Sequence, residues 1–290
     1  MFFDCQFMKE YGKLMEVNMI QKKTLQELTF KDNFMFGAVL LNPEICKGLL
    51  ERVLNKEIER VEVSREKSIV YNPEYKGVRL DAYAKDENFT HYNVEMQVLQ
   101  KPALKKRARY YHSQIDMELL SVGVEYANLP DAYVIFICDF DPFGEGKYCY
   151  TKQIICKEAP NIDMDDGAHT IFLSTKGTNK DEVSEELFKL LQYVGAPDTE
   201  SEKDYGDAFV RQLQSTVREV KASREMGARY MTFQELLKDE HDAGVKQGER
   251  LKLKAIVEKK LAHGDSVEKI AEDLVEDISV IEKIIEELKN

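Results

Sequence analysis

The segment that most constrains the fold is an unbroken apolar run of seven residues, Ala132–Cys138. The run shows no alternation of apolar and polar positions. Both of its faces must therefore be covered, as in a central strand with helices on both sides of the sheet. It is also the longest apolar run in the chain, and a membrane-spanning helix needs about 20 such residues. We therefore expect a chain that folds around a core and does not enter a membrane.

The order of apolar patterns along the chain predicts an α/β fold with a mixed sheet. Helical spacing over 32–56 indicates a helix or a helix pair. Strand-like alternation then extends to about residue 175, interrupted by one helix that begins near Pro102. Helical patterns return after Asn179. A sheet that alternates with helices in this way is expected to be flanked by them.

A β-hairpin carries the most informative polar residues. Apolar residues alternate in the stretches 78–82 and 92–98, and the polar segment 85–90 between them is typical of a turn. We expect the hairpin to be symmetric about Asn88, which fixes the register of its two strands. One face is then apolar and supplies the core, through Leu80, Ala82, Val94 and Met96.

The other face of this hairpin brings two acids together. The register places Asp81 opposite Glu95, and Arg79 opposite Gln97, with all four on one face. Side chains directly opposite each other have Cβ atoms about 4.5–5.5 Å apart. Two carboxylates at that distance repel each other, and a divalent cation such as Mg²⁺ would relieve the repulsion.

A solvated hairpin is the alternative interpretation. Charged residues mostly lie on the surface, and Arg79 or lysines elsewhere could pair with the two acids. Three features favour a metal site instead. The polar residues interrupt an apolar strand pair, Gln97 follows Glu95 by two residues, and a basic helix comes next.

The basic helix is the main local concentration of positive charge. The formal net charge of the chain is −12, which argues against tight non-specific binding to nucleic acid. Residues 101–114, however, contain five Lys/Arg and no acid. Lys105, Arg109 and His112 recur at helical spacing and are expected to share one face. This face could contact phosphates, or it could be a solvated face that balances acids elsewhere.

The ordered motifs resemble a known family. Asp81, a spacer of 13 residues and then Glu95-Met96-Gln97 resemble the D…(D/E)XK core of PD-(D/E)XK nucleases. More closely, the chain resembles the Rpn family of recombination-promoting nucleases and transposases. The similarity extends from about Leu28 to about Met231. The similar stretches are LDAY at 80–83, VEMQ at 94–97, KRARYY at 106–111, YVIFICDFDPF at 133–143 and IFLSTKG at 171–177.

The resemblance implies a restriction-endonuclease-like fold and metal-dependent DNA cleavage. It implies that Asp81 and Glu95 are metal ligands and that Gln97 occupies the lysine position of the superfamily. Glutamine can form hydrogen bonds but supplies no positive charge. Our hypothesis is that Arg79 replaces the lysine; the alternative is a simple ion pair between Arg79 and Asp81.

An acid on the first core helix is frequent in the superfamily. Asp32 and Glu51 are the candidates in this chain. Asp32 is also a natural helix N-cap, because its side chain can accept backbone N–H groups. It is therefore either a cap or an accessory acid of the site.

The sequence thus predicts a metal-dependent DNA endonuclease. Asp81 and Glu95 would hold Mg²⁺, or another divalent cation such as Mn²⁺ or Ca²⁺, while Gln97 would orient water. The residues expected to hold DNA phosphates are Arg79, Lys105, Lys106, Arg107 and Arg109. One alternative is a catalytically silent module of the same fold that binds DNA or protein, and another is a structural, oligomerising protein.

The chain is expected to have three parts: a leader over 1–28, a nuclease-like domain over 29–232 and a helical tail over 233–290. In the tail, the breaks 264–266 and 277–279 separate three short helices that loosely resemble a helix-turn-helix. The last helix carries more acids than bases, so we favour homo-oligomerisation over DNA reading. Five cysteines without a CxxC pair fit a reducing, cytoplasmic location.

Overall fold

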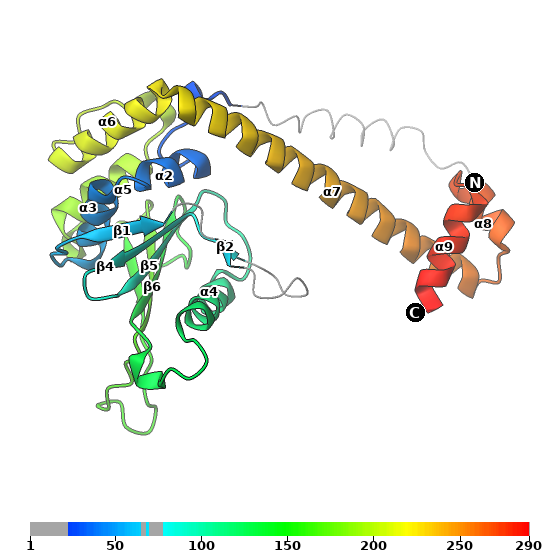
Figure 1. Cartoon of the computed structure of the whole chain (residues 1–290), viewed down its shortest axis with the longest axis horizontal. Helices are drawn as coiled ribbons and strands as arrows, with labels where there is room; N and C mark the ends of the chain where they lie inside the picture. Colours follow the sequence, from blue (N-terminus) through cyan, green and yellow to red (C-terminus); the bar gives the residue numbers. More distant parts are fainter. Residues whose placement is uncertain (1–22, 65–67, 70–77, 290) are drawn as a thin grey trace. The chain divides into compact units, whose positions relative to one another are not determined.

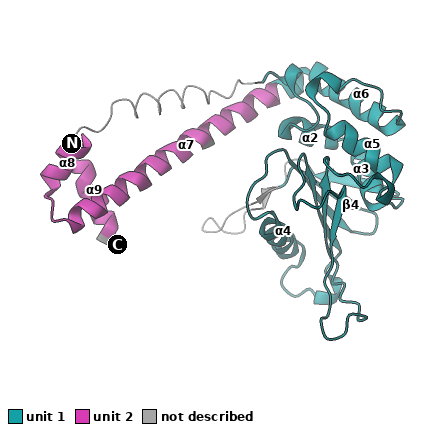
Figure 2. Ribbon diagram, turned by 180° about the vertical axis from the view of Figure 1, so that it is seen from behind, with its two compact units in different colours: residues 1–227 teal, residues 228–290 magenta. Residues whose placement is uncertain are grey.

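The computed structural model describes residues 23–64, 68–69 and 78–289 and divides into two compact units, Met1–Gly227 and Ala228–Asn290 (Figure 2). Within the described residues, the first unit has a six-stranded sheet in the order β1-β4-β5-β6-β8-β7. The strands are β1 (Val61–Ser64), β4 (Ala82–Asp86), β5 (His91–Gln97), β6 (Ala132–Cys138), β7 (Cys149–Lys152) and β8 (Ala168–Ser174). Strands β5, β6 and β8 are parallel and the other pairs are antiparallel, which confirms the predicted mixed sheet.

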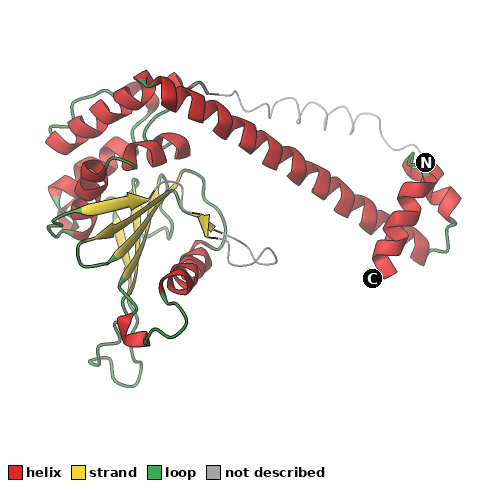
Figure 3. Ribbon diagram, in the orientation of Figure 1, coloured by secondary structure: helices red, strands yellow, loops and turns green. Residues whose placement is uncertain are grey.

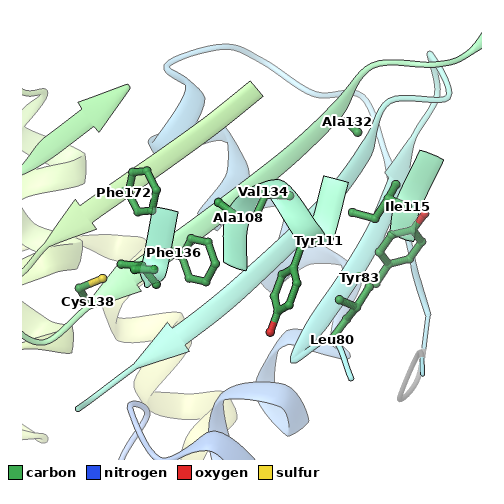
Figure 4. Close-up of a cluster of buried hydrophobic side chains, with 11 residues drawn as sticks. Leu80, Tyr83, Ala108, Tyr111, Ile115, Ala132, Val134, Phe136, Cys138 and Phe172 are labelled. Atoms are coloured by element: carbon green, nitrogen blue, oxygen red, sulfur yellow. The ribbon is translucent and has the colours of Figure 1, made fainter. Parts of the chain in front are cut away.

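The apolar run forms the central strand β6, as predicted. Helix α4 (Leu104–Leu119) covers one face of the sheet, and helices from both ends of the first unit cover the other (Figures 1 and 3). Toward α4, β6 directs every second residue, including Val134 and Phe136, into a core that also contains Tyr111 (Figure 4). On the opposite face Ile135 and Ile137 are fully buried. Both faces of β6 are therefore covered by apolar side chains, which explains why polar and apolar residues do not alternate in this strand.

The helices on the second face begin where the sequence provides caps. The predicted helix pair over 32–56 is α2 (Asn33–Leu40) and α3 (Pro43–Leu54). Asn42 accepts the N–H of Glu44, and Pro43 takes the first helical position, where no N–H partner is needed. The remaining helices of this unit are α5 (Glu185–Val194), α6 (Ala208–Ala222) and the 3-10 helices η1 (Leu25–Glu27), η2 (Tyr126–Asn128), η3 (Lys180–Glu182) and η4 (Asp198–Glu200).

The second unit consists of helices and short connections in its described residues. It contains α7 (Arg224–Ala262, which begins just before the unit), α8 (Val267–Leu274) and α9 (Ile278–Lys289). The first break lies at 263–266, as expected, whereas the second lies at 275–277 and not at 277–279, because α9 begins at Ile278. Helix α7 has 39 residues and is not the short helix we expected. A small core holds the three helices together and consists of Val257, Ile270, Ala271, Ile281 and Ile284. Most of the leader predicted over 1–28 lies outside the described residues. None of the described helices is both long and apolar enough to cross a membrane.

Candidate active site

The hairpin register is the one predicted. Strands β4 and β5 pair from Ala82 with Val94 to Lys85 with His91, which is the register symmetric about Asn88. The buried Asp86 fixes the turn, because its carboxylate accepts the N–H groups of Asn88 and Thr90, each at 2.9 Å. One side chain thus replaces the missing backbone partners of the turn.

Asp81 and Glu95 meet at the start of this hairpin. The backbone N–H of Asp81 donates to Glu95 Oε1 at 3.2 Å, and the N–H of Met96 donates to Asp81 Oδ2 at 3.1 Å. Glu95 is only 2% exposed. Burial, and then the charge of Asp81, raise the pKa of Glu95 above its usual value. A buried carboxyl next to a second acid is stabilised either by a proton or by a bound cation.

Two acids of this kind suit a hard divalent cation. In the described residues, no group of three or more His, Cys, Asp or Glu side chains is placed to hold a metal. Mg²⁺ is, however, commonly held by one or two carboxylates, with waters and substrate phosphates completing its shell. The donor set of Asp81 and Glu95 therefore fits Mg²⁺ or a similar ion bound together with a phosphate.

Gln97 and the residues of α4 form the other half of the site. Gln97 Nε2 donates to the Met96 carbonyl at 2.8 Å, and Gln97 Oε1 accepts from Arg107 Nη1 at 2.7 Å. Arg107 Nη2 donates to the Tyr111 hydroxyl at 3.1 Å and lies 3.8 Å from Glu95 Oε2. The Tyr111 hydroxyl in turn donates to Glu95 Oε2 at 3.3 Å. Among the contacts of the described residues, this network places the guanidinium of Arg107 beside Glu95 and Gln97.

Arg79 does not occupy the backbone position that we predicted. The ladder of β4 and β5 begins at Ala82, and Arg79 lies in β3 (Val78–Arg79), which pairs with β2 (Ser68–Ile69) in a separate two-stranded sheet. Leu80 also precedes β4 and packs in the core beneath α4, not on the face we expected. The side chain of Arg79 lies outside the described residues, so its role stays a prediction.

Two cations of the basic helix line a groove on the surface. Lys105 and Lys106 are exposed and line, with Lys101, a groove of about 770 Å³ that also includes Phe140 and Phe143. The Lys105 ammonium lies over the Phe143 ring, 4.7 Å from its centroid. This groove has no acidic residue in its lining. It could therefore follow a phosphate backbone.

The other two residues of the predicted basic face differ from each other. Arg109 is exposed, but it is not among the residues that line the groove. His112 is buried, with Nε2 3.0 Å from the Thr170 hydroxyl, so our expectation of a shared face is wrong for this residue. His112 follows Ala108 by one helical turn, and Ala108 faces the sheet.

Asp32 lies at the N-cap position of α2 but makes no capping hydrogen bond. Its carboxylate accepts the Thr29 N–H at 2.7 Å and pairs with Lys23 at 3.2 Å. Glu51, in α3, accepts the N–H of Ile58. The accessory role of Asp32 at the site stays a prediction.

Glycine allows α2 to approach the site closely. A Cβ built on Gly37 would lie 3.2 Å from the carbonyl oxygen of Asp81. The backbone of α2 thus supports the residue that begins the site, and a side chain at this position would displace one of the two.

Comparison with known proteins assigns the chain to a family. A search of the curated proteins gave no match, and neither did a search of the solved structures. The mixed sheet, its flanking helices and the paired acids agree with the restriction-endonuclease-like architecture implied by the motifs. The model of the PD-(D/E)XK nuclease family transposases matches residues 24–246. This match covers most of the chain, which therefore belongs to that family.

Proposed function

We propose that the protein is a metal-dependent endonuclease that hydrolyses phosphodiester bonds in DNA. The observation that carries this proposal is the pair of Asp81 and Glu95. The backbone N–H of Asp81 donates to the carboxylate of Glu95, and burial raises the pKa of Glu95. Membership of a nuclease family supports the same chemistry.

Each part of the site has a role in this proposal. Asp81 and Glu95 hold a divalent cation, which would neutralise phosphate charge and acidify a bound water. Gln97 keeps one N–H and one lone pair beyond its two hydrogen bonds, and with them it can orient water. Lys105 and Lys106 hold the DNA backbone along the groove.

The test is cleavage of supercoiled plasmid by the full chain. We expect nicked or linear product with Mg²⁺ or Mn²⁺ and intact plasmid with EDTA. If the parent protein binds DNA but leaves it intact with every divalent cation tried, the endonuclease proposal is wrong.

A catalytically silent DNA-binding module is the second candidate. The absence of a lysine at position 97 favours it, because glutamine supplies no positive charge to the reaction. Binding without cleavage in the plasmid experiment would be its signature.

Replacing Gly37 by alanine is expected to lower cleavage without lowering stability. Alanine favours the helical conformation by up to about 1 kcal/mol over glycine. The new Cβ would, however, press on the Asp81 carbonyl and move it by a fraction of an ångström. Since a shift of about 1 Å at a catalytic group can reduce rates by about 100-fold, we expect a reduction of about tenfold. Melting temperature and plasmid cleavage are measured on the same preparation. If the variant has the melting temperature of the parent and cleaves plasmid at the parental rate, the contact of α2 with the Asp81 carbonyl does not position Asp81 for catalysis.

Replacing both Lys105 and Lys106 by alanine is expected to weaken DNA binding equally for all sequences. Two phosphate contacts would be lost, so the slope of log affinity against log salt should fall by about 2. Fluorescence anisotropy with labelled duplex measures this. Lys203→Ala, at an exposed lysine of the same unit outside the groove, is the matched control. An unchanged salt slope in the double variant would exclude the groove as the DNA path.

A further inference from the structure

We propose that Arg107 supplies at the scissile phosphate the positive charge that Gln97 lacks, from α4 and not from the strand. This inference rests on the proposed function. It replaces our earlier hypothesis for Arg79 with a residue whose contacts the structure describes.

The guanidinium of Arg107 is held in one place. Gln97 Oε1 accepts from Nη1 at 2.7 Å, and the Tyr111 hydroxyl accepts from Nη2 at 3.1 Å. The guanidinium carbon also lies 5.6 Å from the ring centroids of both Tyr111 and Phe136. Cation–π contacts of this length favour a positive charge at the site. Phe136 pairs directly with Glu95 in the β5–β6 ladder, so the ring that supports Arg107 lies beside the metal ligand.

Arg107 lies within ion-pair distance of the Glu95 carboxylate but forms no direct hydrogen bond with it. Its distance to Glu95 Oε2 is 3.8 Å, which is longer than a hydrogen bond, whereas its shortest contact is with the neutral amide of Gln97. Glutamine thus positions the arginine and leaves its charge available. A residue that served only as the structural partner of Glu95 would be expected to bond the carboxylate directly.

Arg107 can still reach a ligand. Its side chain is 28% exposed, and its two hydrogen bonds engage two of five N–H groups. The remaining N–H groups form a planar fork that matches two phosphate oxygens. A phosphate that bridges the fork and a cation on Asp81 and Glu95 would be polarised from both sides.

The experiment removes the positive charge from position 107 on α4 and adds one at position 97 on β5. Arg107→Gln is expected to lower kcat by about 100- to 1,000-fold, the usual effect of removing one preorganised donor from a transition state. Gln97→Lys is then added to Arg107→Gln. Because Gln97 Oε1 lies 2.7 Å from Arg107 Nη1, the new ammonium can enter nearly the same space. The kcat of the double variant is expected to be at least about tenfold higher than the kcat of Arg107→Gln.

Two further readouts separate this role from a structural one. Mn²⁺ affinity and melting temperature are measured for each variant, and both should stay close to the parent values in Arg107→Gln. Arg218→Gln removes a charge from an exposed ion pair on α6 and is the matched control, with parental kcat expected.

The possible outcomes are distinct. If Arg107→Gln cuts as fast as the parent, or if it folds and binds Mn²⁺ normally but Gln97→Lys restores nothing, Arg107 does not replace the lysine. A loss of kcat accompanied by an equal loss of Mn²⁺ affinity would also overturn the proposal, because it would show a structural role. An inactive parent would instead contradict the proposed endonuclease function.

Discussion

Plasmid cleavage by Asp81→Asn and by Glu95→Gln is expected to fall by at least about 100-fold, the effect of losing one electrostatic element of a transition state. Each change removes one of two carboxylates while preserving its size. Asparagine at 81 can still accept the N–H of Met96, and glutamine at 95 can still accept the N–H of Asp81. The lost activity should therefore reflect charge and not local rearrangement.

The stability of the Glu95→Gln variant should move in the opposite direction. Burial and the neighbouring Asp81 raise the pKa of Glu95, so the ionised form is unfavourable in the metal-free protein. Without metal, we expect Glu95→Gln to melt at or above the temperature of the parent. Added Mn²⁺ should raise the melting temperature of the parent but not of the variant. Asp204→Asn, at an exposed acid, is the control. If both site variants cut at the parental rate, the assignment of the metal ligands is wrong.

Phe136→Ala is expected to give the largest loss of stability. Phe136 is fully buried, stacks on Phe172 at 5.5 Å between centroids and lies 5.9 Å from the Tyr111 ring. Removing a buried phenylalanine typically lowers the free energy of unfolding by about 3–5 kcal/mol. For a unit of this size the melting temperature should fall by about 10 °C.

Scanning calorimetry of the full chain measures this change in the transition of the first unit. Phe136→Leu keeps more of the buried volume, so its loss should be smaller than that of Phe136→Ala. Equal melting temperatures for the parent and both variants would show that Phe136 does not stabilise the core.

Local rules in the sequence were sufficient for the central strand and for the hairpin register. Strand β6 could be predicted because a strand buried on both faces has no polar positions to interrupt its apolar run. The register of β4 against β5 could be predicted because alternation and a short turn leave one symmetric pairing. The same rule does not extend to Arg79 and Leu80, since β4 begins only at Ala82 and alternation applies only within a strand.

The position of Arg107 could not be derived from spacing. It depends on how α4 packs over the sheet and on the conformation of a long side chain, and neither is visible in a local pattern. Ala103, which precedes α4, has a φ of 64°, an unusual conformation for alanine that redirects the chain before the helix. The only local signal was the spacing of Arg107 and Tyr111, which places both on one side of a helix.

If Arg107 supplies the charge as we propose, the use of an arginine would affect the pH range of the reaction. A lysine amine loses its proton near a pKa of about 10.4, whereas a guanidinium keeps its charge throughout the range in which proteins stay folded. A site that uses an arginine in place of a lysine, as we propose, would therefore keep this positive charge in alkaline solution. The upper pH limit would then be set by the nucleophile, the metal or unfolding.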